Sequence, residues 1–212
     1  MIETQEVIDF KEVLMGRRSI RNYDKSIKIS KEEMTEILEE ATLAPSSVNM
    51  QSWRFLVIES DEGKATLAPL ASFNQVQVET SSAVIAIFGD LNNFDYREEI
   101  YSKAVELGYM PLEVKETQMS KITAYLSALD PKVNKETVLI DGGIVAMQLM
   151  LVARAHGYDT CPIGGYDKGK IADAFGLDRD RYVPVMLISI GKAAEEGHKS
   201  VRLPINKIAQ WK

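Results

Sequence analysis

Cysteine and histidine are scarce in this 212-residue chain, which has one cysteine, Cys161, and two histidines, His156 and His198. A single cysteine excludes an intrachain disulfide and fits a reducing compartment. Two histidines are too few for a histidine-rich metal site. His156 lies at the end of an expected helix, and we expect it to cap the C-terminus of that helix. We interpret Cys161 as a small buried thiol rather than a nucleophile.

An excess of positive charge and a long hydrophobic run are absent as well. The formal charge of −6 argues against a general binder of nucleic acid or membrane surfaces, which needs a broad basic face. The longest apolar stretch, residues 144–153, is about half of the roughly 20 residues that a membrane span needs. The first ten residues lack the layout of a signal peptide. We therefore expect a cytoplasmic protein with no nucleic-acid or membrane partner.

Several sequence signatures of catalysis and nucleotide binding are missing. The chain has no G-x-G-x-x-G after a strand and no G-x-x-x-x-G-K-[ST], so it carries neither a Rossmann fingerprint nor a P-loop. It also has no G-x-S-x-G elbow and no spaced carboxylate pair suited to hydrolysis. A hydrolytic enzyme of a common type is therefore not indicated.

The apolar fraction of 45% and the charged fraction of 26% are those of an ordinary globular protein, and the length fits one domain. Periodicity and capping patterns indicate helices that alternate with covered strands, so we expect an α+β or α/β fold with one central sheet. The expected helices are residues 30–44, opened by an S-x-x-E capping box, residues 61–71, two within 92–129 split near 108–111, and an apolar core helix over 136–156; the expected strands are 54–59, 83–89 and 184–190.

Two basic stretches lie near opposite ends of the chain. Arg17, Arg18, Ser19 and Arg21 follow a short helical segment, and Gly197 to Pro204 contains Lys199 and Arg202. Arginine suits phosphate oxygens because its guanidinium donates paired hydrogen bonds and keeps its charge near neutral pH. Each stretch alone has a simpler explanation, since cations are common at helix ends and in solvated tails. If the two meet in space, they form a phosphate clamp.

Two further segments have the residue types of a binding loop. Residues 44–53 (A-P-S-S-V-N-M-Q-S-W) offer hydroxyl and amide groups that suit the mixed edge of a heteroaromatic ring, although such residues also form ordinary turns. Residues 159–165 (D-T-C-P-I-G-G) would let bare backbone approach a flat ligand, with a plain turn as the alternative. Gly142 and Gly143 lie within an expected helix, where close approach by a neighbour would explain them.

Taken in order, these segments resemble the FMN-dependent nitroreductase family, in particular the oxygen-insensitive NAD(P)H nitroreductases. The matching pieces span essentially the whole chain: R-R-S-I-R at 17–21, A-P-S-S-V-N-M-Q-S-W at 44–53, F-N-Q-V-Q at 73–77, D-G-G-I-V-A at 141–146, C-P-I-G-G at 161–165 and K-S-V-R-L-P at 199–204. No single piece is diagnostic, whereas the ordered set is specific.

The resemblance implies an α+β sandwich with a central, mainly antiparallel sheet, in an intertwined homodimer with FMN at the interface. Residues 1–212 would form one FMN-binding domain, with a helical excursion at 92–129 near the acceptor pocket and an arm at 203–212 on the partner. The implied flavin contacts are Arg17, Arg18, Ser19, Arg21, Lys199 and Arg202 around the phosphate, ribityl chain and pyrimidine edge, Asn74 and Gln77 at the pyrimidine edge, Pro162, Ile163, Gly164 and Gly165 against the ring, and Pro45, Ser46, Ser47 and Asn49 from the other subunit.

The resemblance also implies a reaction. NADH or NADPH would reduce the flavin by hydride transfer, with the Gly164 amide near N5, and a nitroaromatic, quinone or similar acceptor would then be reduced in a ping-pong cycle. Gln77 stands where several relatives have a lysine, so it offers a dipole instead of a charge. Tyrosines of the excursion could stack on the acceptor or be packing residues, which the sequence leaves open: Tyr96, Tyr101, Tyr109 and Tyr125. Alternatives are a same-fold dehalogenase, dehydrogenase or flavin-fragmenting enzyme, and a non-catalytic flavin-binding regulator.

Overall fold

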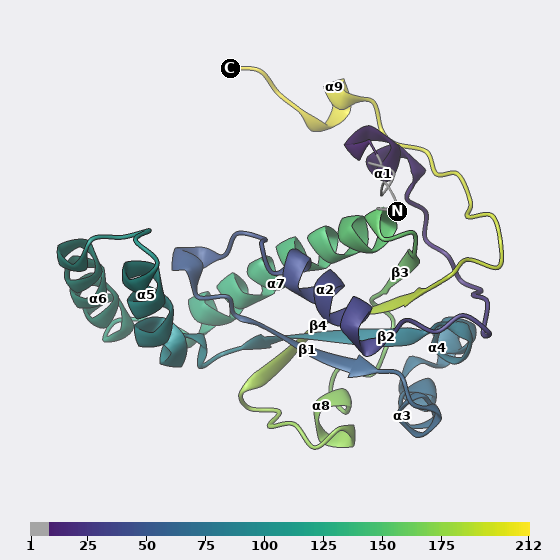
Figure 1. The fold of residues 1–212 in the computed structure, drawn as a ribbon, viewed down its shortest axis with the longest axis horizontal. Helices are drawn as coiled ribbons and strands as arrows, with labels where there is room; N and C mark the ends of the chain where they lie inside the picture. Colours follow the sequence, from purple (N-terminus) through teal and green to yellow (C-terminus); the bar gives the residue numbers. More distant parts are fainter. Residues whose placement is uncertain (1–8) are drawn as a thin grey trace, which may run out of the picture.

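A four-stranded antiparallel sheet forms the centre of the computed structural model, which describes residues 9–212 (Figure 1). The strands are β1 (Trp53–Ile58), β2 (Ala83–Asp90), β3 (Asp159–Ile163) and β4 (Tyr182–Gly191), in the order β1-β2-β4-β3. The predicted α+β class with an antiparallel sheet is confirmed. The signal-peptide prediction concerns the first ten residues, of which 1–8 lie outside the described part of the chain.

Helices cover both faces of the sheet. On one face α2 and α7 bury Met34, Ile37, Val145 and Leu149 against the strands, and on the other α3, η2 and α8 cover a second apolar cluster (Figure 1). The helices are α1 (Phe10–Gly16), α2 (Lys31–Ala41), α3 (Asp61–Leu67), α4 (Gln75–Thr80), α5 (Arg97–Glu106), α6 (Leu112–Leu126), α7 (Pro131–Ala155), α8 (Ile171–Ala174) and α9 (Ile205–Ile208), with 3₁₀ helices η1 (Ser47–Asn49), η2 (Ala68–Asn74) and η3 (Asn93–Tyr96).

The inner strands show how the sequence accommodates a proline inside the sheet. Every residue of β2 is buried, as expected for a strand covered on both faces. Pro184 of β4 pairs with Phe88 beside a register shift at Ile87 and Phe88. On the other side of β4, the neighbouring strand β3 ends at Ile163, opposite Leu187, and so does not reach Pro184. Since a proline cannot donate a ladder hydrogen bond, this bulged position beyond the end of β3 is where one is tolerated.

The core helix α7 is longer than the sequence predicts. It begins at Pro131, where the missing N–H costs nothing, after Asp130 caps the helix by accepting from the Lys132 N–H. It is also the one helix in residues 9–212 that is long and apolar enough to cross a membrane, and 44% of its most apolar window is buried in the fold. Packing on β2 and β4 accounts for that part of its apolar surface.

Gly142 and Gly143 of α7 differ in their surroundings. A Cβ at Gly142 would lie 2.7 Å from Cγ2 of Val185, so the predicted close approach exists there and comes from β4. A Cβ at Gly143 would have nothing within 4 Å in residues 9–212. Ile140 nearby is 64% exposed, and Ile144 and Met147 are partly exposed. One apolar side of α7 is therefore left uncovered by the rest of the described chain.

Two local predictions need correction, and a third segment forms an element that the sequence did not predict. The helix expected over 30–44 ends at Ala41, and only half of the capping box forms: Ser30 accepts from the Glu33 N–H, while the Glu33 carboxylate accepts from Tyr158 instead. The helix expected over 61–71 changes to 3₁₀ geometry at Ala68, next to Pro69. Residues 159–163 form an edge strand rather than a turn, since Thr160 and Cys161 pair with Ile190 and Ser189.

The excursion between β2 and α7 contains the two expected helices, α5 and α6, which project from one end of the sheet (Figure 1). Gly108 between them has φ +71°, a conformation that favours glycine. A small apolar cluster of Met50, Phe94, Tyr101 and Ile122 holds these helices against the connection from α2 to β1. The excursion is thus packed on the segment that contains the predicted binding loop.

Candidate functional site

The two basic stretches lie side by side. Tyr23 and Ala193 form an antiparallel bridge, and the Ala194 N–H donates to the Asn22 carbonyl at 3.0 Å. The Glu195 carboxylate accepts from the backbone N–H of Arg21 at 2.7 Å. Gly197 packs so closely that a Cβ there would lie 2.3 Å from Cβ of Arg18. Backbone hydrogen bonds and close packing therefore hold the two ends of the chain together.

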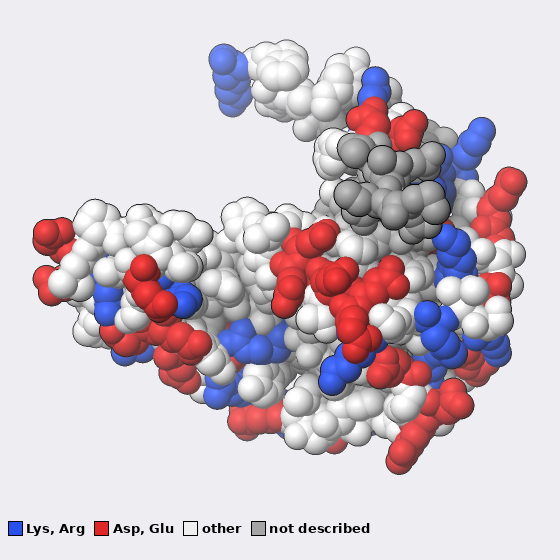
Figure 2. All heavy atoms as spheres, in the orientation of Figure 1, with Lys and Arg blue, Asp and Glu red and all other residues white. Residues whose placement is uncertain are grey.

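A cavity of about 530 Å³ opens between these stretches. No aspartate or glutamate lines it, and within residues 9–212 Arg17, Arg21, Lys199 and Arg202 form no ion pair. Figure 2 shows a group of acidic side chains over α2. Unpaired guanidinium groups in an acidic protein are suited to an anionic ligand. Its lining consists of Leu14, Met15, Arg17, Arg18, Ser19, Arg21, His198, Lys199, Ser200 and Arg202; we call it the basic cavity.

The arginine side chains of the basic cavity differ in the hydrogen bonds that they already form. Nη1 of Arg18 donates to the carbonyls of Met15 and Arg17 at 2.7 and 2.8 Å, so this side chain satisfies the end of α1. The simpler explanation, a cation at a helix end, therefore applies to Arg18. Arg202 donates to the Ser200 hydroxyl and the Val201 carbonyl within its own segment. Arg17 and Arg21 have no side-chain hydrogen bond within residues 9–212.

A polar strip continues from the basic cavity along β3. Ser19 bridges Thr160, and the Ile20 N–H donates to the Thr160 carbonyl at 3.1 Å. Burial raises the pKa of the Cys161 thiol, while the charges of Arg21 and Arg17 and hydrogen bonds from Gln77 and Ser19 oppose that rise. The thiol itself is buried, as predicted.

The strip ends at Asn74 and the glycines after β3. The Asn74 amide donates to the Gly165 carbonyl at 3.0 Å and accepts from Gln77 at 3.1 Å. Gly164 is exposed, and a Cβ there would have nothing within 4 Å in the described chain. Ile163 points into the core and is 2% exposed, so only its backbone faces this strip. Pro162 is half-buried beside it and has no N–H to donate.

The predicted residues between α2 and β1 lie elsewhere. Pro45, Ser46 and Ser47 line a separate cavity of about 210 Å³ over α7, and no residue of the basic cavity lines it. The Ser47 N–H donates to Oδ1 of the buried Asp141 at 3.1 Å. Figure 1 shows this connection over α7, away from α1. One chain therefore brings together the basic residues, Asn74, Gln77 and the β3 end, but not Pro45, Ser46, Ser47 and Asn49.

This connection has a strained backbone that the sequence did not indicate. Val48, Asn49 and Gln51 have φ values of 44°, 57° and 47°, in the left-handed region. Such conformations cost about 1–3 kcal/mol each for non-glycine residues and concentrate at functional sites. They are stabilised here by the Tyr101 hydroxyl, which donates to the Val48 carbonyl at 3.2 Å, and by Gln51 N–H, which donates to Ser46 Oγ at 2.9 Å.

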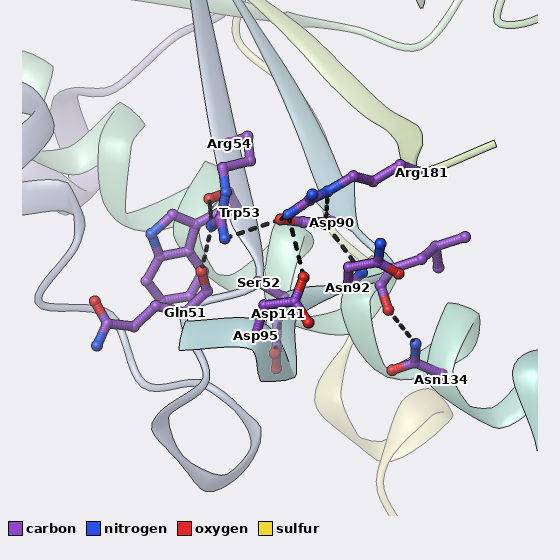
Figure 3. Close-up of polar contacts among 11 residues, drawn as sticks. Gln51, Ser52, Trp53, Arg54, Asp90, Asn92, Asp95, Asn134, Asp141 and Arg181 are labelled. Carbon is purple, nitrogen blue, oxygen red and sulfur yellow. Dashed lines mark hydrogen bonds and ion pairs between the residues drawn. The ribbon is translucent and has the colours of Figure 1, made fainter. Parts of the chain in front are cut away.

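A buried ionic network, also missed by sequence reasoning, holds the base of the excursion (Figure 3). Asp90, at the end of β2, is 0% exposed and accepts from Nε and Nη2 of Arg181 at 2.8 and 2.9 Å. Arg54 of β1 contacts it at 2.9 Å and stacks over Tyr96 of η3 at 4.6 Å. Burial raises the pKa of the Asp90 carboxyl, but hydrogen bonds from Arg181 and the Asn92 N–H and the charge of Arg54 outweigh it, so that the pKa lies below its usual value. The sequence offered one sign of this network, an aspartate at the end of an otherwise apolar strand.

The four tyrosines of the excursion have different environments. Tyr101 is a packing residue, since its ring is buried and its hydroxyl is bonded. Tyr109 is exposed and lines none of the cavities described above. Tyr96 lies under Arg54, and the ring of Tyr125 is 6.2 Å from that of Phe94. Tyr96 and Tyr125 each line a cavity, of about 570 and 340 Å³ respectively.

Comparison with known proteins gives matches over nearly the whole chain. Residues 14–192 match the model of the nitroreductase family. The chain is 72% identical over 212 residues, 100% of both chains, to "Putative NAD(P)H nitroreductase YdgI" of Bacillus subtilis. It is 38% identical over 189 residues, 89% of this chain and 87% of the other, to the "CLA biosynthesis enone reductase" of Lactiplantibacillus plantarum.

A solved structure matches equally well. A "putative nitroreductase in complex with FMN" from Exiguobacterium sibiricum superimposes with a TM-score of 0.95 at 68% identity, covering 97% of this chain and 98% of that one. The family match, the sequence identities and this superposition agree with the antiparallel sheet and its helices. The chain belongs to the nitroreductase family.

Proposed function

We propose that this protein is an FMN-dependent NAD(P)H oxidoreductase that reduces quinones, nitroaromatics or similar electron-poor acceptors. The observation that carries the proposal is the basic cavity, in which cations from both ends of the chain face one space without a carboxylate. Two unpaired guanidinium groups, Arg17 and Arg21, fit a phosphate monoester. The FMN in the Exiguobacterium structure and the NAD(P)H in the Bacillus name support the same cofactors here.

In this proposal each part of FMN has its own set of residues. Arg17, Arg21, Lys199 and Arg202 hold the phosphate, with Arg18 at the end of α1 and Ser19 toward the ribityl chain. The polar strip serves the ring: Asn74 and Gln77 face the pyrimidine edge, and Pro162, Ile163, Gly164 and Gly165 offer backbone, with the Gly164 N–H toward N5. When bound, FMN supplies two-electron transfer between nicotinamide and acceptor.

We also propose that the active form is a homodimer. The connection between α2 and β1 would bring Pro45, Ser46, Ser47 and Asn49 to the flavin of a second copy. Two observations support this: the uncovered side of α7 around Ile140 and Ile144, and a C-terminal segment whose Trp211 is 88% exposed. That segment extends away from the rest of the molecule (Figure 1), as an arm at 203–212 that wraps a partner would. Residues 1–212 then act as one cytoplasmic FMN-binding domain.

The acceptor is the least determined part of the proposal. A quinone gains two electrons and two protons and becomes a hydroquinone, while NAD(P)H becomes NAD(P)⁺ and one proton comes from water. A nitro group gains the same electrons and protons and loses water to give a nitroso group. The Lactiplantibacillus relative is named for enone reduction, which is also a two-electron reduction of an electron-poor double bond. Enones therefore belong among the acceptors to be tested.

A visible spectrum of the purified protein tests the proposal. We expect a flavin spectrum that NADH or NADPH bleaches under anaerobic conditions and that menadione restores. A bleached flavin that no quinone, nitroaromatic or enone reoxidises would favour a same-fold enzyme of different chemistry. A flavin that neither nucleotide reduces would indicate a non-catalytic regulator, and a colourless protein that takes up no added FMN would contradict the proposal.

A further inference from the structure

One buried side chain, Asp141, fastens the connection between α2 and β1 to α7. Oδ1 of Asp141 accepts from the Ser47 N–H at 3.1 Å. Oδ2 accepts from the Ser52 hydroxyl at 3.0 Å (Figure 3). Ser47 begins η1 and Ser52 directly precedes β1, while Asp141 is 3% exposed. One carboxylate therefore holds both ends of the segment 47–52.

The backbone between these two anchors is strained and needs support. Val48, Asn49 and Gln51 all have positive φ, and none of them is a glycine. Such conformations persist only where the surrounding structure imposes them. Ser46, which precedes η1, forms no cap hydrogen bond to it. The first N–H of η1 is satisfied instead by Asp141, from a different helix.

The helix that carries Asp141 is packed closely on the sheet at this point. A Cβ at Gly142 would lie 2.7 Å from Cγ2 of Val185 in β4. A Cβ at Gly89 of β2 would lie 2.8 Å from Cγ2 of Val138, one turn earlier on α7. The helix cannot shift or rotate here without a clash. A side chain on such a rigid element positions its partners more precisely than a loop residue does.

The charge of Asp141 has no counterion in the described chain. No lysine, arginine or histidine of residues 9–212 forms an ion pair with it. Asp90, the other buried aspartate, contacts Arg54 and Arg181. A buried carboxylate that only neutral donors contact is unfavourable for stability. The role of Asp141 therefore lies in the segment that it holds rather than in the stability of α7.

This segment borders the uncovered side of α7. Residues 45–47 line the cavity of about 210 Å³ together with Ile140, Asp141 and Ile144. Ile140 is among the exposed apolar residues of this helix. A second copy packed on this side of α7 would therefore meet the segment that Asp141 holds.

We propose that Asp141 is a positioning residue for the flavin site of a second copy. Through Ser47 and Ser52 it keeps residues 45–49 in the conformation that reaches the flavin bound in the partner's basic cavity. It acts through this segment and does not itself contact the flavin. This inference rests on the proposed function, because it concerns the same FMN and the same dimer.

Titration of the apoprotein with FMN, followed by flavin fluorescence, tests the assignment. We expect Asp141→Ala to bind FMN about tenfold more weakly than wild type and to remain dimeric, because the segment loses both anchors. Asp141→Asn should bind close to wild type, since its amide still accepts from Ser47 and donates to Ser52. Thr137→Val is the matched control: Thr137 lines the same cavity, but its hydroxyl donates to the Val133 carbonyl.

A mixed dimer shows which copy Asp141 serves. Arg17→Ala damages the basic cavity of its own chain, whereas Asp141→Ala would damage the site of its partner. One chain of each variant, co-purified with two different affinity tags, would place both defects on one flavin site and leave the other site intact. We expect one FMN site of wild-type affinity in this dimer. A residue that only supports the fold of its own chain would leave both sites weakened.

Ser52→Ala keeps the inference testable if Asp141→Ala does not fold. It removes only the contact to Oδ2, so FMN should bind more weakly than in wild type, by a smaller factor than in Asp141→Ala. It should also complement Arg17→Ala in the mixed dimer. In that case, wild-type FMN affinity of Ser52→Ala would overturn the inference.

The outcomes separate this inference from the proposed function. Suppose that wild type binds FMN and NADPH reduces it, but Asp141→Ala binds FMN equally well or the mixed dimer has two weakened sites. The proposed function then stands, and the assignment of Asp141 is wrong. A monomeric Asp141→Ala protein would show that Asp141 supports the interface, which also overturns the inference. A wild-type protein that binds no FMN would contradict the proposed function itself, and this inference with it.

Discussion

At the scale of single residues, the site depends on which cations are free. Arg18 is occupied with the carbonyls that end α1, whereas Arg17 and Arg21 have no hydrogen-bond acceptor for their side chains among residues 9–212. The sequence alone could not separate them, because helix-end and ligand-binding arginines have the same local pattern. The separation comes from the carbonyls of Met15 and Arg17, which accept hydrogen bonds from the Arg18 guanidinium at the end of α1.

Removal of one phosphate contact should weaken FMN retention. Arg17→Ala and Arg202→Ala each delete a guanidinium from the basic cavity, and a hydrogen bond between charged groups contributes about 1.5–3 kcal/mol. We expect each variant to bind FMN about tenfold or more weakly than wild type, measured by fluorescence titration of the apoprotein. Arg179→Ala is the control, since Arg179 pairs with Asp173 on the surface. Variants that retain FMN as wild type does would show that the clamp is wrong.

Residues that act through long-range contacts were the hardest to predict. Arg54 lies in β1, Asp90 ends β2 and Arg181 immediately precedes β4, and no local pattern links them. The left-handed backbone of Val48 had no glycine to indicate it. By contrast the basic stretches, Asn74 and the glycines after β3 have distinctive local sequences, which is why they were identified.

At the scale of helices and strands, periodicity predicted most of the individual helices and strands. It did not predict the features that depend on pairing with neighbouring elements. The covered strands β2 and β4 match their expected ranges to within a few residues, and α5 and α6 lie within 92–129 on either side of the expected split at 108–111. For residues 159–165 a plain turn was one of the two interpretations left open, because Pro162 and the two glycines that follow β3 are typical of turns. Residues 159–163 form an edge strand, β3. Within residues 9–212 no further strand lies on its outer side, where the missing N–H of Pro162 is tolerated.

The Asp90 network joins β1, β2 and β4 to η3, and its stability contribution depends on pH. The pKa of Asp90 is lower in the folded protein than its usual value, so its contribution is present above the unfolded pKa and is lost as the pH falls through the folded pKa. Asp90→Asn leaves two arginines without their carboxylate and should lower the free energy of unfolding by about 3–5 kcal/mol at pH 7. Urea denaturation at pH 7 and in the acid range measures this.

The control for this network is Asp95→Asn. The Asp95 carboxylate is 3.9 Å from Arg181 and mostly exposed, so its removal should change the unfolding free energy by less than about 1 kcal/mol. We also expect the acid-induced loss of stability to be smaller in Asp90→Asn than in wild type. Equal losses in the two proteins would mean that another carboxyl group dominates the acid transition.

The uncovered side of α7 tests the proposed dimer. Ile144→Glu adds a charge on this side, where Ile140 and Met147 are also exposed in one chain. A charge buried at an apolar interface without a partner is strongly unfavourable, so we expect dissociation to monomers in light scattering coupled to gel filtration. Lys135→Glu, at an exposed position of the same helix, should remain dimeric. A wild-type protein that is monomeric would contradict the proposal directly.

At the scale of the whole molecule, one chain contains only part of the proposed flavin surface. The basic cavity and the polar strip are continuous, while Pro45, Ser46, Ser47 and Asn49 lie over α7 away from them. The C-terminal segment carries Val201, Leu203 and Trp211 exposed. Sequence patterns predicted the fold class because it follows from local periodicity. They could not give the relative positions of the two halves, which depend on packing across the sheet and on a second copy.

The central claim, that two basic stretches from opposite ends of the chain bind the phosphate of FMN, is tested most directly by comparing FMN with riboflavin. The two ligands share the ring and the ribityl chain and differ in the phosphate. Calorimetric titration of the apoprotein should give one FMN per chain and an affinity for riboflavin at least about tenfold weaker, since charge-assisted hydrogen bonds to the phosphate would be lost. Equal affinities for the two ligands, or no binding of FMN, would contradict the claim.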